Sequence, residues 1–160
     1  MPDLLVNLLK LPAFESASQE FLVRRAQPFE FSVVRAFVAG RFSQSWADEI
    51  SVGFARQPVS VFVATKEGNE TKERELIGFA AYECTRRSFF GPMGVVENAQ
   101  HEGVGKALLF AALTALREMG YVYAIIGAAG PVRFYQKTVG AIIIPDSEPG
   151  IYTDMLKSKP

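Results

Sequence analysis

The most informative stretch of the sequence is AQHEGVGKALL, residues 99–109, in which two glycines stand directly before an apolar run with helical spacing. The first turn of a helix leaves backbone N–H groups unpaired and carries partial positive charge, so an anion binds there if the chain lets it come close. Side chains at Gly103 and Gly105 would block such an approach. We therefore interpret the stretch as a phosphate-binding turn. The alternative, which these residues alone leave open, is a glycine-containing turn that only begins a helix.

Two familiar phosphate-binding motifs do not fit this stretch. A P-loop has two glycines separated by four residues, followed by Lys and then by Ser or Thr. Here Gln100 stands where the first glycine would be, and Ala107 follows Lys106. A dinucleotide-binding turn needs a third glycine three residues after the second, and Leu108 occupies that position. The spacing therefore argues against nucleotide hydrolysis and against hydride transfer.

The rest of the chain mixes segments of helical and strand periodicity, which indicates a protein with both helices and strands. Helices are predicted at 29–40, from Ser43 or Ser45 onward, at 104–119 and at 132–139, and strands at 20–26, 59–65, 76–83, 88–97, 121–126, 141–144 and 151–156. The strand at 88–97 contains Gly91, Pro92 and Gly94, so its regular pairing is expected to fail midway. Residues 4–11 fit an added strand, a short helix or a packing arm.

Length, charge and cysteine content limit the class of protein. The chain has 160 residues, the size of one domain, and its 17 basic and 17 acidic side chains cancel, so nucleic acid is not expected as a partner. The single cysteine, Cys84, excludes an intramolecular disulfide, and with one histidine it argues against a metal site. We read no signal peptide and no apolar run of membrane-spanning length. The expected location is the cytoplasm, without a membrane partner.

Gln100, Gly103 and Gly105 resemble the acetyl-CoA signature of the GNAT N-acetyltransferase superfamily, which reads Arg or Gln, two variable residues, Gly, one variable residue, then Gly or Ala. The stretch FYQKTVGA at 134–141 resembles another segment of the same family, and the likeness extends over about 76–152. It implies an α/β (α+β) GNAT fold: a mixed, mostly antiparallel central sheet of about six to seven strands, flanked by about four helices, with the fourth and fifth strands splayed. We accordingly expect an N-terminal arm at 1–18 and a single acetyltransferase domain at 19–160.

The resemblance also implies acetyl-CoA (CoA) as co-substrate, lying in the gap between the splayed strands. Met93 and Val95 are the candidates for backbone contacts with the pantetheine arm, and an N–H near Gly94 or Val95 is the candidate for polarising the thioester carbonyl. The residues expected to contact the cofactor are Met93, Gly94, Val95, Gln100, His101, Glu102, Gly103, Val104, Gly105, Lys106 and Tyr135. No metal is expected. Many relatives carry an asparagine seven residues before the tyrosine, where this chain has Ala128.

For catalysis, the resemblance implies direct attack of an amine on the thioester. Tyr135 is the expected general acid, which protonates the leaving thiolate. Glu83 is the candidate base, and Glu97 is a second carboxylate in a comparable position. His101 is expected to face the loop or solvent rather than to act in catalysis.

The expected acceptor is a small-molecule or peptide amine whose identity the sequence does not give. Six aromatic residues lie in or beside the first two predicted helices: Phe29, Phe31, Phe37, Phe42, Trp46 and Phe54. Most are expected in the core, and a few are expected to line an apolar acceptor pocket. The loop at 145–150 is expected to overhang the same side. A homodimer is left open. The alternative function is a non-catalytic acyl-CoA-binding or sensor module of the same fold.

Overall fold

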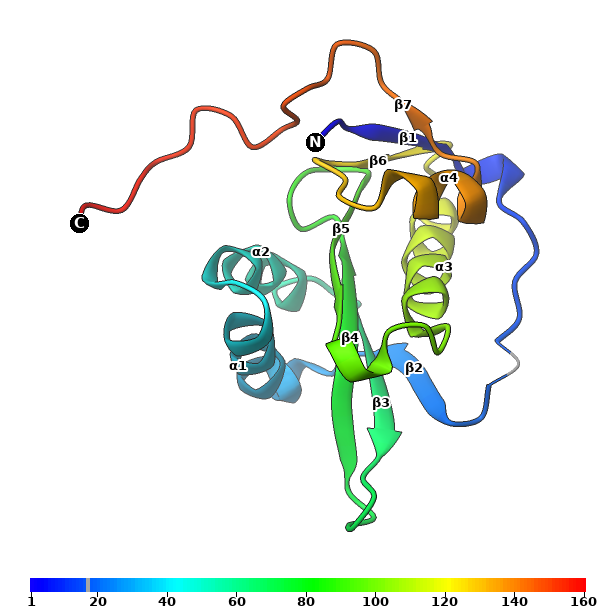
Figure 1. Ribbon diagram of the computed structural model, residues 1–160, viewed down its shortest axis with the longest axis vertical. Coiled ribbons are helices and arrows are strands. Elements are labelled where there is room, and N and C mark those ends of the chain that lie inside the picture. Colours follow the sequence, from blue (N-terminus) through cyan, green and yellow to red (C-terminus); the bar gives the residue numbers. More distant parts are fainter. Residues whose placement is uncertain (17) are drawn as a thin grey trace.

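A computed structural model describes residues 1–16 and 18–160 and contains a seven-stranded sheet with helices on both faces (Figure 1). The strands are β1 (Leu4–Asn7), β2 (Phe21–Arg25), β3 (Val61–Glu67), β4 (Arg74–Tyr82), β5 (Phe89–Val95), β6 (Tyr123–Ile126) and β7 (Ile142–Ile143). Their order in the sheet is β2-β3-β4-β5-β6-β1-β7, and only the β5–β6 pair is parallel among the described strands. The predicted mixed, mostly antiparallel sheet is confirmed.

Helices cover the two faces of this sheet. The pair α1 (Phe31–Arg41) and α2 (Gln44–Phe54) packs on one face, while α3 (Val104–Glu118) and α4 (Val132–Val139) contribute to the core on the other (Figure 1). Ser43, one of two predicted caps, begins α2, and its hydroxyl accepts the Trp46 N–H at 3.1 Å. Within the described part of the chain, no helix is long and apolar enough to cross a membrane.

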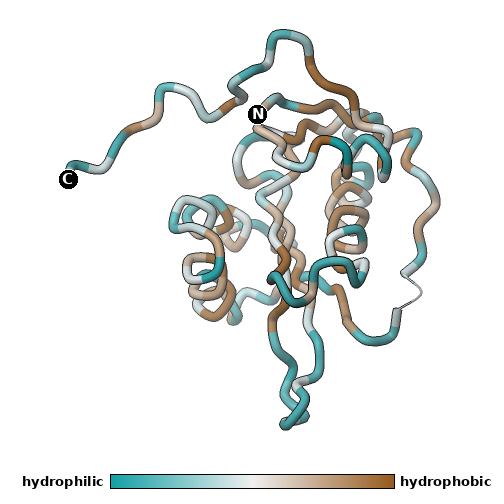
Figure 2. Tube along the Cα trace, viewed as in Figure 1, coloured by the Kyte–Doolittle hydropathy of each residue, from teal (hydrophilic) through white to brown (hydrophobic). Residues whose placement is uncertain are grey.

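The central strands separate two hydrophobic cores, because successive side chains of a strand point to opposite faces. On β4, Phe79 and Ala81 belong to the core under α1 and α2, whereas Ala80 and Tyr82 belong to the core under α3. The trace of α3 is largely hydrophobic, while the turn between β3 and β4 is hydrophilic (Figure 2). Burial of both faces explains why β4 is apolar over most of its length.

The N-terminal segment forms an interior strand of the sheet. Leu4 on β1 lies opposite Ile126 on β6 and also opposite Ile143 on β7. Leu4 and Val6 are both 0% exposed and lie in the core under α3. Of the three structures that residues 4–11 fit, two are present: the added strand at Leu4–Asn7 and a short 3-10 helix at Leu8–Lys10.

The strand predicted at 151–156 does not form. β1 occupies the edge of β6, and the segment instead bonds to side chains, with the Ile151 N–H donating to Asp3 and the Tyr152 hydroxyl to Glu49. Asp154 also has a φ of +54°, which is not an extended conformation. After β7 the chain turns toward the side of α2, and its last residues extend away from the sheet (Figure 1). The division into an arm at 1–18 and a domain at 19–160 stays a prediction, and residue 17 lies outside the described residues.

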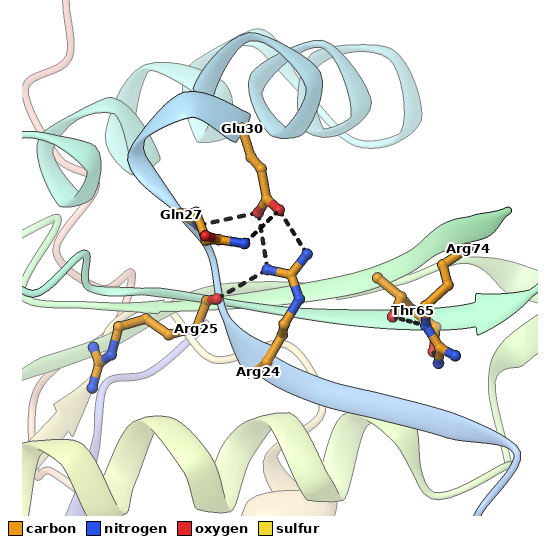
Figure 3. Close-up of polar contacts among 6 residues, drawn as sticks. All are labelled: Arg24, Arg25, Gln27, Glu30, Thr65 and Arg74. Atoms are coloured by element: carbon orange, nitrogen blue, oxygen red, sulfur yellow. Dashed lines mark hydrogen bonds and ion pairs between the residues drawn. The ribbon is translucent and has the colours of Figure 1, made fainter.

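Glu30 ties β2 to the short turn that precedes α1. Its carboxylate accepts two hydrogen bonds from the Arg24 guanidinium, at 2.6 and 3.0 Å, and one from the Gln27 N–H at 3.1 Å (Figure 3). The hydrogen bonds from Arg24 hold the pKa of Glu30 below its ordinary value. The Glu30–Arg24 pair therefore stabilises the fold fully at pH values above the ordinary carboxyl pKa. This stabilisation is lost as pH falls through the lower pKa that Glu30 has in the folded state.

We expect Glu30→Gln to lower the free energy of unfolding at pH 7 by about 1 kcal/mol, because the pair is bidentate but partly exposed to solvent. Urea unfolding at pH 7 and pH 3 measures this, and the difference from the unmodified chain should shrink at pH 3. Glu67→Gln is the matched control, since the carboxylate of Glu67 is mostly exposed and lies 3.9 Å from Arg74. An equal loss at both pH values would contradict the ionic origin of the effect.

Candidate functional site

The parallel strands β5 and β6 separate along their length. They pair only at Phe89–Ile125 and Phe90–Ile126. Beyond Phe90, β5 bulges at Gly91, whose φ is +112°, and its register against β4 shifts there, as predicted. β5 then continues to Val95, while β6 ends. One edge of the second half of β5 is therefore unpaired.

The backbone groups of Met93 and Val95 face this unpaired edge. The Val96 N–H donates to the Ile77 carbonyl at 2.9 Å, and hydrogen-bonded pairs alternate along an antiparallel ladder. Gly94 therefore bonds to β4, whereas Met93 and Val95 turn their N–H and C=O groups away from it. An unpaired strand edge of this kind binds an extended ligand through main-chain hydrogen bonds. Of the two N–H groups predicted to polarise a carbonyl, that of Val95 faces the gap.

Gly94 has a packing role in addition. A Cβ atom at this position would lie 2.5 Å from the ring of Phe42. That ring packs against Phe79, with 5.5 Å between ring centres, and against Trp46, with 5.8 Å. The aromatic cluster beneath β5 therefore accounts for a glycine here without any ligand.

A cavity of about 640 Å³ occupies the gap between β5 and the segment that follows β6. Met93 and Tyr135 both line it, and the Tyr135 ring meets the rings of Phe90 and Phe134 edge-on, with 6.1 and 5.2 Å between centres. Burial raises the pKa of Tyr135 above its ordinary value, so the phenol keeps its proton at neutral pH. The cavity thus joins an unpaired strand edge to a protonated phenol.

The glycine loop lies where β5 is followed by α3. Gly103 begins α3 with a φ of +84°, a left-handed conformation that favours glycine. A Cβ atom on Gly105 would meet only the side chain of Val95, at 3.7 Å, so the space in front of the first turn is open. The N–H groups of Val104, Gly105 and Lys106 belong to that first turn and have no intrahelical partner. The loop therefore fits an anion.

The side chains of the same loop mostly bind within the protein. Gln100 donates from Nε2 to the Val95 carbonyl at 3.2 Å, and Glu102 pairs with Lys66 at 3.4 Å. Lys106 places its Nζ 5.6 Å from the centre of the Phe14 ring. His101 is exposed. Backbone N–H groups rather than a cluster of basic side chains are what this loop offers to an anion.

The two carboxylates predicted as candidate bases do not line the cavity at the gap. Glu83 is 1% exposed, accepts the Ser88 N–H at 2.5 Å and lies 3.8 Å from Arg56. These contacts hold the turn between β4 and β5. Glu97 lies in the turn after β5, at the opposite end of that strand from Phe90.

Sequence reasoning missed the acidic residues Asp48 and Glu49 of α2, which do line the cavity. Glu49 accepts hydrogen bonds from the hydroxyl groups of Thr85 and Tyr152, the latter at 2.9 Å. Burial and the nearby Glu49 carboxylate raise the pKa of Tyr152 to about 12. Trp46, one of the aromatic residues predicted at the acceptor pocket, also lines the cavity, and it lies one turn before Glu49 on the same face of the helix.

Ala128, which stands where many relatives carry asparagine, lies in the loop at the edge of the cavity. Its φ is +46°, a conformation that asparagine adopts more easily than alanine. The Ala128 N–H donates to the Asp3 carboxylate at 2.7 Å, and the same carboxylate accepts the Ile151 N–H at 3.3 Å. The segment before β1 therefore holds both loops at this edge.

Cys84 has no role at the cavity. It is buried, and burial raises the pKa of its thiol to about 11, so the thiol stays protonated and unreactive at neutral pH. Among the residues that the structure describes, no group of His, Cys, Asp and Glu side chains could hold a metal ion.

Comparison with known proteins identifies the family of this chain. The sequence profile of the Acetyltransferase (GNAT) family matches residues 21–141, and the chain belongs to this family. The matched range contains the gap, the glycine loop and Tyr135, but it begins after β1. No curated protein matches the sequence closely enough to indicate its acceptor.

Solved structures share the fold. A GCN5-related N-acetyltransferase from Sphaerobacter thermophilus matches with a TM-score of 0.69 and 14% identity, over 89% of this chain and 48% of that one. A GCN5-related glucosamine N-acetyltransferase region of a fungal multi-domain β-N-acetylglucosaminidase matches with a TM-score of 0.70 and 14% identity, over 89% of this chain and 19% of that one. This chain therefore spans less than half the length of either relative.

A third structure covers lengths that are more nearly equal. It is a GNAT family acetyltransferase from Brucella melitensis in complex with acetyl-CoA, with a TM-score of 0.54 and 19% identity, over 75% of this chain and 82% of that one. At these identities the likeness shows the fold alone.

Proposed function

We propose that this chain transfers the acetyl group of acetyl-CoA to the nitrogen of an amine. The observation that carries the proposal is the cavity of about 640 Å³, where the unpaired edge of β5 meets the protonated phenol of Tyr135. Membership of the acetyltransferase family supports acetyl transfer in general, and the relative from Brucella melitensis holds acetyl-CoA.

The residues at the gap fit acetyl-CoA. The first turn of α3, from Val104 to Lys106, would hold the diphosphate through backbone N–H groups, because Gly103 and Gly105 leave the approach open. The Met93 carbonyl and the Val95 N–H would bind the pantetheine arm as outward main-chain groups, whereas the Val95 carbonyl already accepts a hydrogen bond from Gln100. Bound there, acetyl-CoA supplies a thioester, which is an acetyl group already activated for transfer.

The chemical step then uses two groups of this chain. The amine nitrogen forms a C–N bond with the carbonyl carbon, and the electron pair of the C–S bond leaves on sulfur. Val95 lies beside the first turn of α3 and does not line the cavity, so the outward N–H of Met93, which does line it, would stabilise negative charge that develops on the carbonyl oxygen. Tyr135 would give its proton to the sulfur and regain one from water, which balances the proton that the nitrogen loses. The products are an amide and free CoA.

Release of CoA thiol in the presence of acetyl-CoA and a panel of primary amines tests this function. We expect amine-dependent release, together with a higher melting temperature when acetyl-CoA is added, because a ligand that binds only the folded state stabilises it. A raised melting temperature without release for any amine would favour the non-catalytic acyl-CoA-binding module instead. No stabilisation by acetyl-CoA would contradict both functions.

A further inference from the structure

The cavity has an acidic wall on α2 and apolar walls elsewhere. Trp46 on α2, with Phe89 and Phe90 on β5, contributes aromatic surface. Asp48 and Glu49 are its acidic lining residues, and within the described part of the chain no Lys, Arg or His side chain lines it; Met1 also lines it, and its α-ammonium lies 3.5 Å from the Glu148 carboxylate and is paired there. A carboxylate on a ligand would therefore lose its hydration without gaining a basic partner, which is costly. The lining suits an apolar ligand that carries positive charge.

The two acidic residues differ in what already neutralises them. Asp48 Oδ1 accepts hydrogen bonds from the Arg35 guanidinium and from Gln44 Nε2, each at 3.0 Å. Glu49 is bound by hydroxyl groups alone, those of Thr85 and Tyr152, and forms no ion pair with any described residue. Hydroxyl donors leave the negative charge of Glu49 in place. Among the described charged groups that line the cavity, Asp48 pairs with Arg35 and the Met1 ammonium pairs with Glu148, so Glu49 is the one without an ion pair.

We propose that Glu49 binds the ammonium group of the acceptor, and that the acceptor is a small primary monoamine with an apolar body and no carboxylate. This inference rests on the proposed acetyl transfer. An ammonium group would donate charge-assisted hydrogen bonds to the half-buried Glu49 carboxylate, while the apolar body of the ligand packs against the aromatic wall around Trp46. The bound ammonium loses a proton to water before the free amine attacks, and the bond changes are then those given above.

The charged residues that line the cavity also argue against two other classes of amine as acceptor. A diamine carries a second positive charge, for which the cavity offers only the already paired Asp48. An amino acid carries a carboxylate, which would lie near Asp48 and Glu49 without a basic side chain to receive it. The cavity should therefore discriminate against diamines and amino acids because their extra charged group finds no partner, and not because of the size of these ligands.

Three amines of known charge test the substrate class. CoA release from acetyl-CoA is measured in three separate assays, each with one amine: 2-phenylethylamine, L-phenylalanine or 1,4-diaminobutane. We expect kcat/KM for 2-phenylethylamine to exceed the other two values by about tenfold or more, because each of the others leaves a charged group without a partner. A higher value for L-phenylalanine or 1,4-diaminobutane would overturn this inference and leave acetyl transfer intact. If none of the amines causes CoA release, acetyl transfer is overturned, and this inference with it.

A matched pair of Glu→Gln variants, one at the cavity and one outside it, tests the residue. Glu49→Gln keeps an oxygen for Thr85 and Tyr152 but removes the charge, so KM for 2-phenylethylamine should rise about tenfold or more while KM for acetyl-CoA is unchanged. Glu67→Gln removes the same charge at an exposed position on β3 outside the cavity, so it should leave both KM values unchanged. Equal effects of the two substitutions, or no effect of Glu49→Gln in a folded variant, would overturn the role of Glu49.

Discussion

The variant Val6→Asp is expected to be largely unfolded at 25 °C. Val6 is 0% exposed on β1, lies opposite Ala124 on β6 and packs in the core under α3. A carboxylate at this position loses its hydration and gains no partner, which costs several kcal/mol, and a domain of this size has only about 5–15 kcal/mol of stability. Far-UV circular dichroism and urea unfolding measure the loss.

The next residue along the strand provides the control. Asn7 points to the other face of the sheet, and its side chain accepts the Leu9 N–H at 3.1 Å, a bond that aspartate also makes. Asn7→Asp should therefore keep the urea midpoint close to that of the unmodified chain. If Val6→Asp unfolds at the same urea concentration as Asn7→Asp, β1 does not belong to the sheet.

The variant Tyr135→Phe is expected to lower kcat by about 10²- to 10⁴-fold, because it removes the proton donor for the leaving thiolate. The ring contacts with Phe90 and Phe134 need no hydroxyl, so stability and KM for acetyl-CoA should change little. Steady-state CoA release and thermal unfolding measure the two effects separately. Tyr123→Phe is the control, since Tyr123 is 53% exposed on β6 and lies outside the cavity.

The pH dependence of kcat tests the same role. A phenol acts as an acid only below its pKa, and burial raises the pKa of Tyr135 above its ordinary value. Loss of the acid form should therefore cause no decrease in kcat up to about pH 10, the ordinary tyrosine value. Full activity of Tyr135→Phe, or a decrease in kcat near neutral pH that this substitution abolishes, would contradict the assignment.

Local features of the sequence were enough to predict the centre of the fold. Gly103 and Gly105 mark the start of α3, and the helical spacing of apolar residues after them gives its length. The bulge in β5 follows from Gly91 and Pro92, because neither residue supports a regular ladder. These features need no knowledge of distant contacts, so they were correct without a structure.

Contacts between distant segments decided what the sequence left open or predicted wrongly. Residues 4–11 have no clear periodicity, and only pairing with β6 and β7 makes β1 a strand. The segment at 151–156 has strand-like composition, but its first residues bond to side chains of distant segments, Ile151 to Asp3 and Tyr152 to Glu49. Glu83 lies at the end of a strand, as predicted, yet its burial and its bonds to the next turn are tertiary facts. Glu49 was missed because only the packing of α2 against β5 shows which of its faces lines the cavity.

A crystal structure of the chain with CoA tests the central claim most directly, namely that the gap between β5 and β6 is where acetyl transfer occurs. We predict the diphosphate at the N–H groups of Val104 to Lys106, the pantetheine amides bonded to the backbone of Met93 and Val95, and the thiol facing the Tyr135 hydroxyl. CoA bound elsewhere, or bound at the gap with its thiol turned away from Tyr135, would contradict this account.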